Sequence, residues 1–555
     1  MKLKQTPNRS PLLLALLIPL TVLSGCGGSS GSGGTKPVIP PPTDTGPKWV
    51  QDQFQSSANY AAQCENPRTG NSPITGDAYP DKPGSELLEK HWQRAFNHET
   101  YLWYKEVIDK DPKNYNLVEY FDQLKTTEVT ASGKDKDEFH WLQPTSEVEE
   151  YVQLGVSYGY GISFDRQSST APRQWIVKNV TLETQAFTAG VSRGSKLLKV
   201  DGIDFVNTDN DDEIDIINNA IFSYIEGEPH TFTFVDVNDV EYQVELQTAA
   251  ISDVPLQIAK TIETPQGKTG YLLLNTFHNS KVEKDLFDSF TDFAQQDISN
   301  LIVDLRYNGG GYLAISSQLA YMVTGPEATA GKIYETTVYN DKIPNQNIPF
   351  IDTTIDLRRL IGGDSIIESD QALPTLNLNR VYVLTTGSSC SASESFMNSL
   401  VGIGIEVIQI GDTTCGKPYG FVSEDNCGST YYTVQFKGEN DAGFGDYADG
   451  LIPSKLPEAG KQAQIQGCPI IEDYQNDLGD EQEILLASAL YYQQNNACPD
   501  IEEQSSIRMK PASSQTMLSE AEVKLQGKTP AQNAIIHDAY FDKYRHINTK
   551  GSSDE

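Results

Sequence analysis

The segment from residue 85 to residue 124 carries hydrophobic residues at helical spacing. Leucines and aromatic residues recur every three or four positions, which predicts an amphipathic helix with one buried face. Asp111-Pro112 marks a stop, and residues 117–124 predict a second, shorter helix. We therefore expect a helical N-terminal domain over residues 49–150, with the aromatic residues in its core.

Between residues 151 and 250 the pattern changes to short strands separated by glycine turns. Residues 156–164 (VSYGYGISF) alternate in polarity and carry glycines, and residues 175–180 predict a second strand. Residues 189–202 read AGVSRGSKLLKVDG, which places glycines at turns around an apolar strand. These signals predict a separate β domain over residues 151–250.

From residue 251 to residue 500 predicted strands and helices alternate. Apolar runs predict buried strands at 271–274, 301–305, 381–384 and 407–410, and amphipathic runs predict helices at 282–295, 314–323, 393–400 and 480–493. This alternation is typical of a mostly parallel sheet covered by helices, in which sites form at the carboxyl ends of strands. A glycine loop, a serine-rich run and a lysine-bearing turn each follow a predicted strand, so we expect them to meet.

The first residues resemble a bacterial lipoprotein signal peptide. A positively charged start precedes an apolar run at 11–23, which is too short to span a bilayer and ends in Leu-Ser-Gly-Cys. The resemblance implies a signal peptide over residues 1–25, cleavage before Cys26 and a lipid anchor on Cys26 in a bacterial membrane. An ordinary secretory signal is the alternative. Gly27 implies the outer membrane facing the periplasm, with the cell surface as a second location.

The two ends of the chain predict segments outside the folded domains. Residues 26–48 are rich in Gly and Ser and then in Pro, which is typical of a tether that becomes stiffer along its length. Residues 501–555 are polar and predict a tail with one helix near 530–545.

The charge and the cysteines limit the function classes. The formal net charge is −34, so we expect no nucleic-acid partner, because phosphate binding needs a basic face. Six cysteines remain besides Cys26, and an even number in an oxidising compartment predicts disulfides of undetermined pairing. The pairs closest in sequence are Cys415–Cys427 and Cys468–Cys498. No metal-binding spacing occurs, so we expect neither metal nor cofactor. The sequence does not indicate an oligomeric state.

Ser391 and Lys417 are the strongest catalytic candidates. Ser391 lies in SSCSASES at 388–395, and Lys417 lies in GDTTCGKP at 411–418. A serine hydroxyl becomes a strong nucleophile only when a base takes its proton, and a lysine can be that base when its amine is neutral. Burial in an apolar pocket favours the neutral amine. The pair therefore predicts acyl transfer without a histidine, and a hydrolase acting on peptides.

Other residues compete for these roles. A serine-rich turn before a helix is by itself usually an N-cap. Ser393 is the rival nucleophile, and Ser388 and Ser389 are further alternatives. His278 is the only histidine near one of the three loops and is the alternative base.

Three motifs together resemble those of peptidase family S41, the C-terminal processing proteases. They are DLRYNGGG (304–311), SASE (391–394) and GDTTCGK (411–417), and the β domain before them resembles a PDZ domain. The resemblance covers about 151–493. It implies an α+β multidomain fold with a helical N-terminal unit, a PDZ-like domain and an α/β core of the S41 (ClpP/crotonase-like) type.

The resemblance also assigns roles to individual residues. It implies Ser391 as the nucleophile, Lys417 as the general base, and the backbone amides of Gly310 and Ala392 as the oxyanion donors. In the PDZ-like domain it implies a carboxylate-binding loop, formed by Tyr158, Gly159, Tyr160 and Gly161, that holds the C-terminus of a protein or peptide substrate. Asp304 and Arg306 are expected to fix the glycine loop. A β module without a ligand remains the alternative for the PDZ-like domain.

The motifs also depart from the family pattern. Many members carry a glutamine four residues after the lysine, where this chain has Phe421, and Pro418 replaces a small residue. A third catalytic residue is therefore not assigned. Cys390 and Cys415 are expected either to form a disulfide that braces the site or to be free. The alternatives to a serine endopeptidase are a catalytically silent S41-fold binding or scaffold lipoprotein, and a hydrolase of non-peptide esters or amides.

Overall fold

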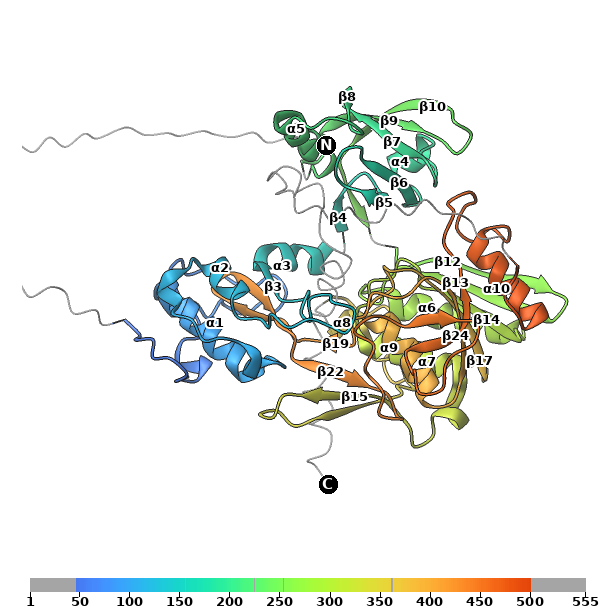
Figure 1. The fold of residues 1–555 in the computed structure, drawn as a ribbon. Coiled ribbons are helices and arrows are strands. Elements are labelled where there is room, and N and C mark those ends of the chain that lie inside the picture. Colours follow the sequence, from blue (N-terminus) through green and yellow to red (C-terminus); the bar gives the residue numbers. More distant parts are fainter. Residues whose placement is uncertain (1–45, 155, 224, 253, 361–362, 501–555) are drawn as a thin grey trace, which may run out of the picture. The chain divides into compact units, whose positions relative to one another are not determined.

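The computed structural model describes residues 46–500 except 155, 224, 253 and 361–362 (Figure 1). The predicted signal peptide, the lipidation site Cys26, most of the tether and the C-terminal tail with its expected helix lie outside the described residues. Among the helices of residues 46–500, none is both long enough and apolar enough to cross a membrane.

A seven-stranded sheet forms the core of the region that follows residue 255. Its order is β12-β13-β14-β17-β18-β24-β23, and every neighbouring pair is parallel except β12 with β13. The strands are β12 (Leu256–Thr264), β13 (Gly267–Leu274), β14 (Asn300–Asp304), β17 (Arg380–Thr385), β18 (Glu406–Gly411), β23 (Ile452–Ser454) and β24 (Gln464–Pro469). The alternation predicted from the sequence therefore produces the expected, mostly parallel sheet.

Helices cover both faces of this sheet. The helices α6 (Val282–Gln295), α7 (Leu313–Thr329) and α9 (Ala392–Gly402) share one hydrophobic cluster with Leu272 and Val303. The helix α10 (Ile484–Asn495) packs with Leu273 and Ile302 on the other face (Figure 1). Neighbouring residues of one strand point to opposite faces of the sheet. Because helices bury both faces, the strands are continuous apolar runs without the alternation of a half-exposed strand.

The three motif loops follow three adjacent strands. The glycine loop follows β14, the serine-rich run follows β17, and the lysine-bearing turn follows β18. Because these strands are parallel neighbours, their carboxyl ends lie at one edge of the sheet. This confirms the expected meeting of the loops and positions the site.

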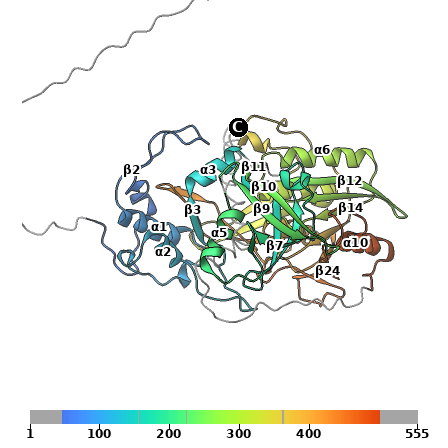
Figure 2. The same ribbon diagram turned by 90° about the horizontal axis from the view of Figure 1, so that it is seen from above.

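A second sheet forms the β domain, with order β10-β9-β7-β6-β5 and β8 paired to β7. Its strands are β5 (Ile162–Ser168), β6 (Gln174–Val180), β7 (Lys196–Val200), β8 (Ile203–Asp204), β9 (Pro229–Val235) and β10 (Glu241–Gln247). The helices α4 (Gln185–Thr188) and α5 (Asp211–Ile221) accompany it (Figure 1), and Figure 2 shows α5 from above. The strands β4 (Val156–Gly159) and β11 (Ala249–Ser252) form a separate pair that joins the two ends of the domain. The strand β5 forms one edge of the larger sheet.

The N-terminal region contains helices, as expected, and also strands that the pattern did not predict. The helices are α1 (Glu86–Thr100), α2 (Leu117–Asp122) and α3 (Thr145–Leu154), and the strands are β1 (Gln63–Cys64), β2 (Lys82–Pro83) and β3 (Trp141–Pro144). The strand β3 pairs with β21 (Ser429–Tyr432), which also pairs with β20 (Glu424–Asn426). The N-terminal region therefore shares a sheet with residues just beyond the lysine-bearing turn.

A further small sheet has the order β16-β15-β22-β19. It contains β15 (Ile333–Tyr339), β16 (Gln346–Pro349), β19 (Tyr419–Gly420) and β22 (Phe436–Glu439), and the short helix α8 (Leu357–Leu360) follows β16. Since β19 begins two residues after Lys417, this sheet helps to hold the lysine-bearing turn in place.

Three disulfides connect the six cysteines after Cys26. They join Cys468 to Cys498, Cys390 to Cys415 and Cys64 to Cys427. The first pair was expected from sequence proximity, and the expected Cys415–Cys427 pair is wrong. Proximity along the chain failed there because β3 and α1 bring the N-terminal region against β21, which places Cys64 beside Cys427.

Candidate active site

Ser391 lies at a sharp turn between β17 and α9. It is the N-cap residue of α9, with φ 54° and ψ −113°. A non-glycine residue with positive φ costs about 1–3 kcal/mol, and such strain concentrates at functional sites. The turn directs Ser391 into a cavity that Lys417 also lines. The structure thus brings together the two residues that the sequence singled out.

Lys417 is buried, with 1% of its surface exposed. Its Nζ lies 4.5 Å from the ring centre of Phe421 and 5.4 Å from that of Phe139. Phe421 occupies the position where many S41 members have glutamine, so here that position gives the lysine an aromatic wall. Phe139 comes from the N-terminal region, and no sequence pattern predicted its place beside the lysine.

The cavity is narrow, and five aromatic side chains form much of its wall. Its volume is ≈ 20 Å³, about the room that one water molecule needs. The other lining residues include Tyr312, Leu313, Tyr419, Phe436 and Tyr447, and one carboxylate, Glu335. Glu335 is 3% exposed on β15 and accepts a hydrogen bond from Ser395. The walls must move apart before a substrate side chain can enter.

Glu394 connects the nucleophile turn to the lysine-bearing turn. Its Oε2 accepts hydrogen bonds from the amides of Ser391 (3.0 Å) and Lys417 (2.8 Å). Its Oε1 accepts from the amide of Gly416 (2.9 Å) and from the hydroxyl of Thr414. All four groups are donors, so an ionised carboxylate fits this position.

The environment of Glu394 acts on its pKa in two directions. Complete burial raises the pKa of Glu394, and the hydrogen bonds from Thr414 and from the amides of Lys417, Gly416 and Ser391 lower it in part. Glu394 was not among the candidate residues predicted from the sequence. The Ser-x-x-Glu spacing of Ser391 and Glu394, typical of a capping box, was the available signal.

Glu394→Gln is expected to lower peptidase activity about 10²-fold and the free energy of unfolding by about 1–3 kcal/mol. The glutamine NH₂ group would face donors that already point at it, which displaces one catalytic turn from the other. Steady-state cleavage kinetics and denaturant unfolding measure both effects. Glu481→Gln, at an exposed position, is the matched control and should change neither. Unchanged kinetics in Glu394→Gln would refute the positioning role.

The rival serines have structural partners. Ser393 Oγ donates to the carbonyl of Asn308 (2.9 Å), and Ser389 Oγ donates to the carbonyl of Leu305 (2.8 Å). Both side chains therefore tie the serine-rich run to the glycine loop. Ser391 and Ser395 are the two serines that line the cavity.

Gly310 lies directly against Ser391. A Cβ at Gly310, whose φ is 113°, would lie 2.8 Å from Ser391 Cβ, so only glycine fits. Its amide, the expected oxyanion donor, instead donates to Asn308 Oδ1 at 2.9 Å. Gly311 lines the cavity beside Ser391. The glycine loop is thus adjacent to the nucleophile, with the Gly310 amide held by a side chain.

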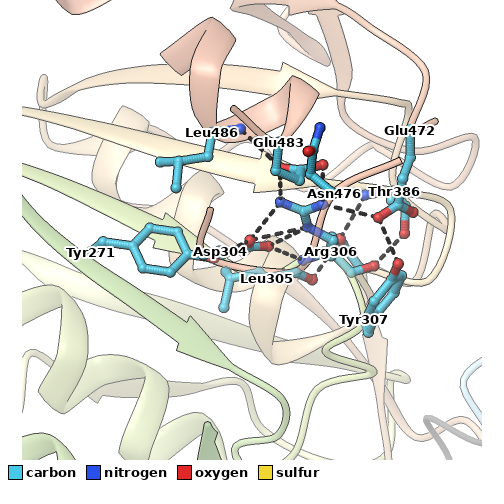
Figure 3. Close-up of polar contacts among 12 residues, drawn as sticks. Tyr271, Asp304, Leu305, Arg306, Tyr307, Thr386, Glu472, Asn476, Glu483 and Leu486 are labelled. Carbon is cyan, nitrogen blue, oxygen red and sulfur yellow. Dashed lines mark hydrogen bonds and ion pairs between the residues drawn. The ribbon is translucent and has the colours of Figure 1, made fainter. Parts of the chain in front are cut away.

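Asp304 and Arg306 belong to a buried ion cluster under the glycine loop (Figure 3). The Arg306 guanidinium lies 2.7 Å from Asp304, 2.7 Å from Glu483 and 2.9 Å from Glu472. Burial alone would lower the pKa of Arg306, but Asp304 and Glu483 raise it well above its ordinary value. These contacts agree with the structural role expected for both residues.

The same cluster reaches the β domain through Arg193. The Arg193 guanidinium pairs with Glu472 and donates to the Tyr307 hydroxyl (2.7 Å) and to the Asn476 carbonyl (3.0 Å). Burial would raise the pKa of Glu472, but Arg306 and Arg193 lower it below its ordinary value. Tyr307 is the third residue before Gly310, so the cluster connects the β domain to the glycine loop.

The Cys390–Cys415 disulfide joins the residue before Ser391 to the turn that carries Lys417. Removing it with Cys390→Ala and Cys415→Ala should lower the free energy of unfolding by about 3 kcal/mol, because the bond closes a loop of 25 residues. It should also lower kcat, because the two catalytic turns lose their covalent connection.

The Cys468–Cys498 pair provides a control for this prediction. Its loop of 30 residues predicts a similar loss of stability, but the bond lies on the α10 face, away from the cavity. Denaturation and cleavage kinetics of both double variants separate stability from catalysis. Equal kcat losses would contradict a specific role for Cys390–Cys415.

His278, the alternative base, lies beside the glycine loop. It is 5% exposed, and its ring lies tilted against that of Tyr312, with centroids 4.7 Å apart. The Gly311 backbone packs against it, since a Cβ at Gly311 would lie 2.4 Å from the His278 amide nitrogen. Tyr312 lines the cavity, whereas His278 is not among the lining residues of that cavity.

The expected carboxylate loop lines a larger groove of ≈ 760 Å³. Tyr158, Gly159, Tyr160 and Gly161 lie at one part of it, and β5 continues from them. The groove also includes Tyr307, Gly309 and Ser388 of the catalytic loops. A chain segment that occupied it would therefore contact both the β domain and the edge of the catalytic site.

Comparison with known protein families matches residues 268–424 to the family described as Peptidase family S41. The match contains the glycine loop, Ser391 and Lys417. This region belongs to peptidase family S41. The family is one of peptidases, and the motifs that suggested it are the ones that the fold brings together.

One solved structure shares the fold, and a second is similar at a lower score. A protein from Bacteroides fragilis NCTC 9343, assigned to the S41 proteases, is 21% identical, with a TM-score of 0.54 over 76% of this chain and 98% of that one. The photosystem II D1 C-terminal processing protease is 16% identical, with a TM-score of 0.41 over 66% of this chain and 92% of that one. A comparison with curated proteins finds no match.

Proposed function

We propose that this S41 peptidase is a serine endopeptidase that uses Ser391 as its nucleophile and Lys417 as its general base. The observation that carries the proposal is that both residues line one narrow cavity, the serine at a strained turn and the lysine among aromatic rings. The shared contact of their backbone amides with Glu394 supports a fixed relation between them.

The chemistry takes two steps. Lys417 Nζ accepts the proton of Ser391 Oγ as the oxygen attacks the peptide carbonyl, and the resulting ammonium returns that proton to the leaving amine as the C–N bond breaks. The product is an ester on Ser391. Lys417 then takes a proton from a water molecule that attacks the ester, and Ser391 leaves with that proton.

Backbone amides would stabilise the oxyanion in both steps. We propose the amide of Ala392, which directly follows the nucleophile, together with an amide of the glycine loop. Gly310 is the candidate expected from the sequence, and its amide would have to exchange Asn308 for the oxyanion. Gly311, which lines the cavity, is the second candidate donor.

The β domain is proposed to act as a PDZ-like module that holds the substrate C-terminus. Three features support this role: the glycine-containing loop of Tyr158–Gly161, the edge strand β5, and the groove that extends from both to Ser388 and Gly309. Gly161 has φ 76°, and a Cβ there would lie 2.6 Å from Thr184. A peptide would add a strand to the β5 edge and place its carboxylate at the loop.

We also propose that Cys26 anchors the protein in the outer membrane of a bacterium, with the peptidase facing the periplasm. The basis is the sequence of the first residues alone. The two other assignments of the catalytic fold, a silent binding lipoprotein and a hydrolase of non-peptide esters or amides, are outcomes of the experiment below.

The experiment is digestion of an unfolded protein substrate by the full chain, with product termini identified by mass spectrometry. The proposal predicts new internal termini, lost in Ser391→Ala, and slower cleavage when the substrate C-terminus is amidated. No cleavage of any peptide or ester substrate would favour the silent binding protein. Cleavage of small esters without peptides would favour the second alternative. Amidation without effect would remove the PDZ-like role only.

A further inference from the structure

The groove of the β domain has a charge character opposite to that of the whole chain. The chain carries a net charge of −34, yet the charged residues that line the groove are two cations, Arg166 and Lys178, and one acid, Asp165. A positive site on a strongly acidic protein favours anionic ligands and disfavours cationic ones.

Arg166 lies in the part of the groove between β5 and α5. Its guanidinium is 4.7 Å from the ring centre of Trp175 and 5.6 Å from that of Phe222, which follows α5. Ile162 and Phe164 precede it on β5 and pack against the same hydrophobic cluster as Trp175. These three β5 side chains therefore lie on the face of the sheet that packs against α5, and a strand added at the β5 edge would present every second side chain to that same face.

The end of the groove near the carboxylate loop is apolar. Tyr158 and Leu182 line it while remaining 38% and 44% exposed, and Phe232 packs there against Tyr160 of the loop. Exposed large hydrophobic side chains that gather in one groove are typical of a binding surface. This end fits an apolar side chain at the last residue of a peptide.

The strand geometry relates the two parts of the groove. A peptide whose carboxylate lies at Gly161 and whose chain runs back along β5 is antiparallel to β5. Arg166 lies roughly 16 Å from Gly161 along an extended strand of about 3.3 Å per residue. Residues that lie opposite each other in paired strands point to the same face of the sheet. Arg166 on β5 would therefore lie on the same face as about the fifth residue from the C-terminal end of the bound peptide.

We propose that this groove selects substrate tails with an apolar last residue and an acidic side chain about five residues from the end, which Arg166 recognises. The inference rests on the proposed function of the β domain, because it names the substrate class of that same module. Lys178, whose Nζ lies 4.7 Å from the ring centre of Tyr307, adds positive charge where the groove approaches the glycine loop. Burial lowers the pKa of Arg166.

The test measures binding of fluorescein-labelled peptides to the full chain carrying Ser391→Ala. The peptides end in Ala-Val-Ala with a free carboxylate and differ only in carrying Glu, Ala or Lys at the fifth residue from the end. The Glu peptide should bind about fivefold more tightly than the Ala peptide, and the Lys peptide more weakly than both. Added salt should reduce the differences.

Two charge-matched variants assign the effect. Arg166→Met keeps an apolar stem and should remove the preference for Glu, whereas Lys199→Met, at an exposed position of β7 outside the groove lining, should retain it. Arg166→Glu should make the Lys peptide the tightest of the three. Equal affinities for the three peptides, or a preference that survives Arg166→Met, would overturn the inference.

An amidated version of the Glu peptide keeps this inference distinct from the proposed function. Loss of binding on amidation together with equal affinity for the Glu, Ala and Lys peptides would leave the PDZ-like role intact and refute the acid selection. If amidation did not change binding, the carboxylate site would be refuted. The position opposite Arg166 would then be refuted too, because it is counted from a carboxylate held at Gly161.

Discussion

Replacing Ser391 with alanine should lower kcat/KM for peptide cleavage by at least about 10³-fold. The variant removes the oxygen that forms the acyl-enzyme, and the amides near the cavity can supply only weak residual catalysis. The fold should be retained, because the Glu394 contact is made to the amide of residue 391, which alanine keeps. Cleavage kinetics together with circular dichroism check both parts.

Ser393→Ala is the matched control for Ser391→Ala. Its hydroxyl donates to the Asn308 carbonyl, so its loss should cost about 1 kcal/mol of stability and less than about tenfold in rate. If Ser393→Ala abolished cleavage while Ser391→Ala retained it, the nucleophile would have been assigned to the wrong serine.

Lys417→Met should lower kcat by a similar factor of at least about 10³. Methionine keeps an unbranched apolar stem beside Phe421 and Phe139, so packing should survive while the amine is lost. Lys417→Arg separates two roles of the residue. A guanidinium stays protonated and cannot accept the serine proton, although it preserves the positive charge. The measurement is kcat for peptide cleavage by both variants at several pH values.

Lys417→Arg is expected to be as inactive as Lys417→Met. Substantial activity in Lys417→Arg would mean that the lysine acts as a fixed charge rather than as a base. Lys455→Met, at an exposed position, controls for the general loss of one lysine and should behave as the unaltered protein.

The sequence predicted the catalytic core well because its signals are local. The apolar runs at 271–274, 381–384 and 407–410 lie within strands of the core sheet, and the run at 301–305 extends one residue beyond β14. Parallel order then determines which strand ends are neighbours, so the meeting of the three loops followed from strand alternation alone.

The remaining features depend on contacts between distant segments. Nothing near Phe139 indicated that it would lie 5.4 Å from the Lys417 amine, because β3 reaches that place by pairing with β21. The Cys64–Cys427 disulfide spans 363 residues for the same reason. Glu394 is an intermediate case. Its position three residues after Ser391 can be read from the sequence, but its contact with the lysine-bearing turn can be seen only in the folded structure.

The most direct test of the central claim is the location of a covalent adduct after reaction with a fluorophosphonate, which phosphonylates activated serine hydroxyls. Peptide mapping by mass spectrometry should place one adduct on Ser391 in the unaltered full chain, and none there in Lys417→Met. An unmodified Ser391, or an adduct that forms equally well without Lys417, would contradict the claim that the buried lysine activates this serine.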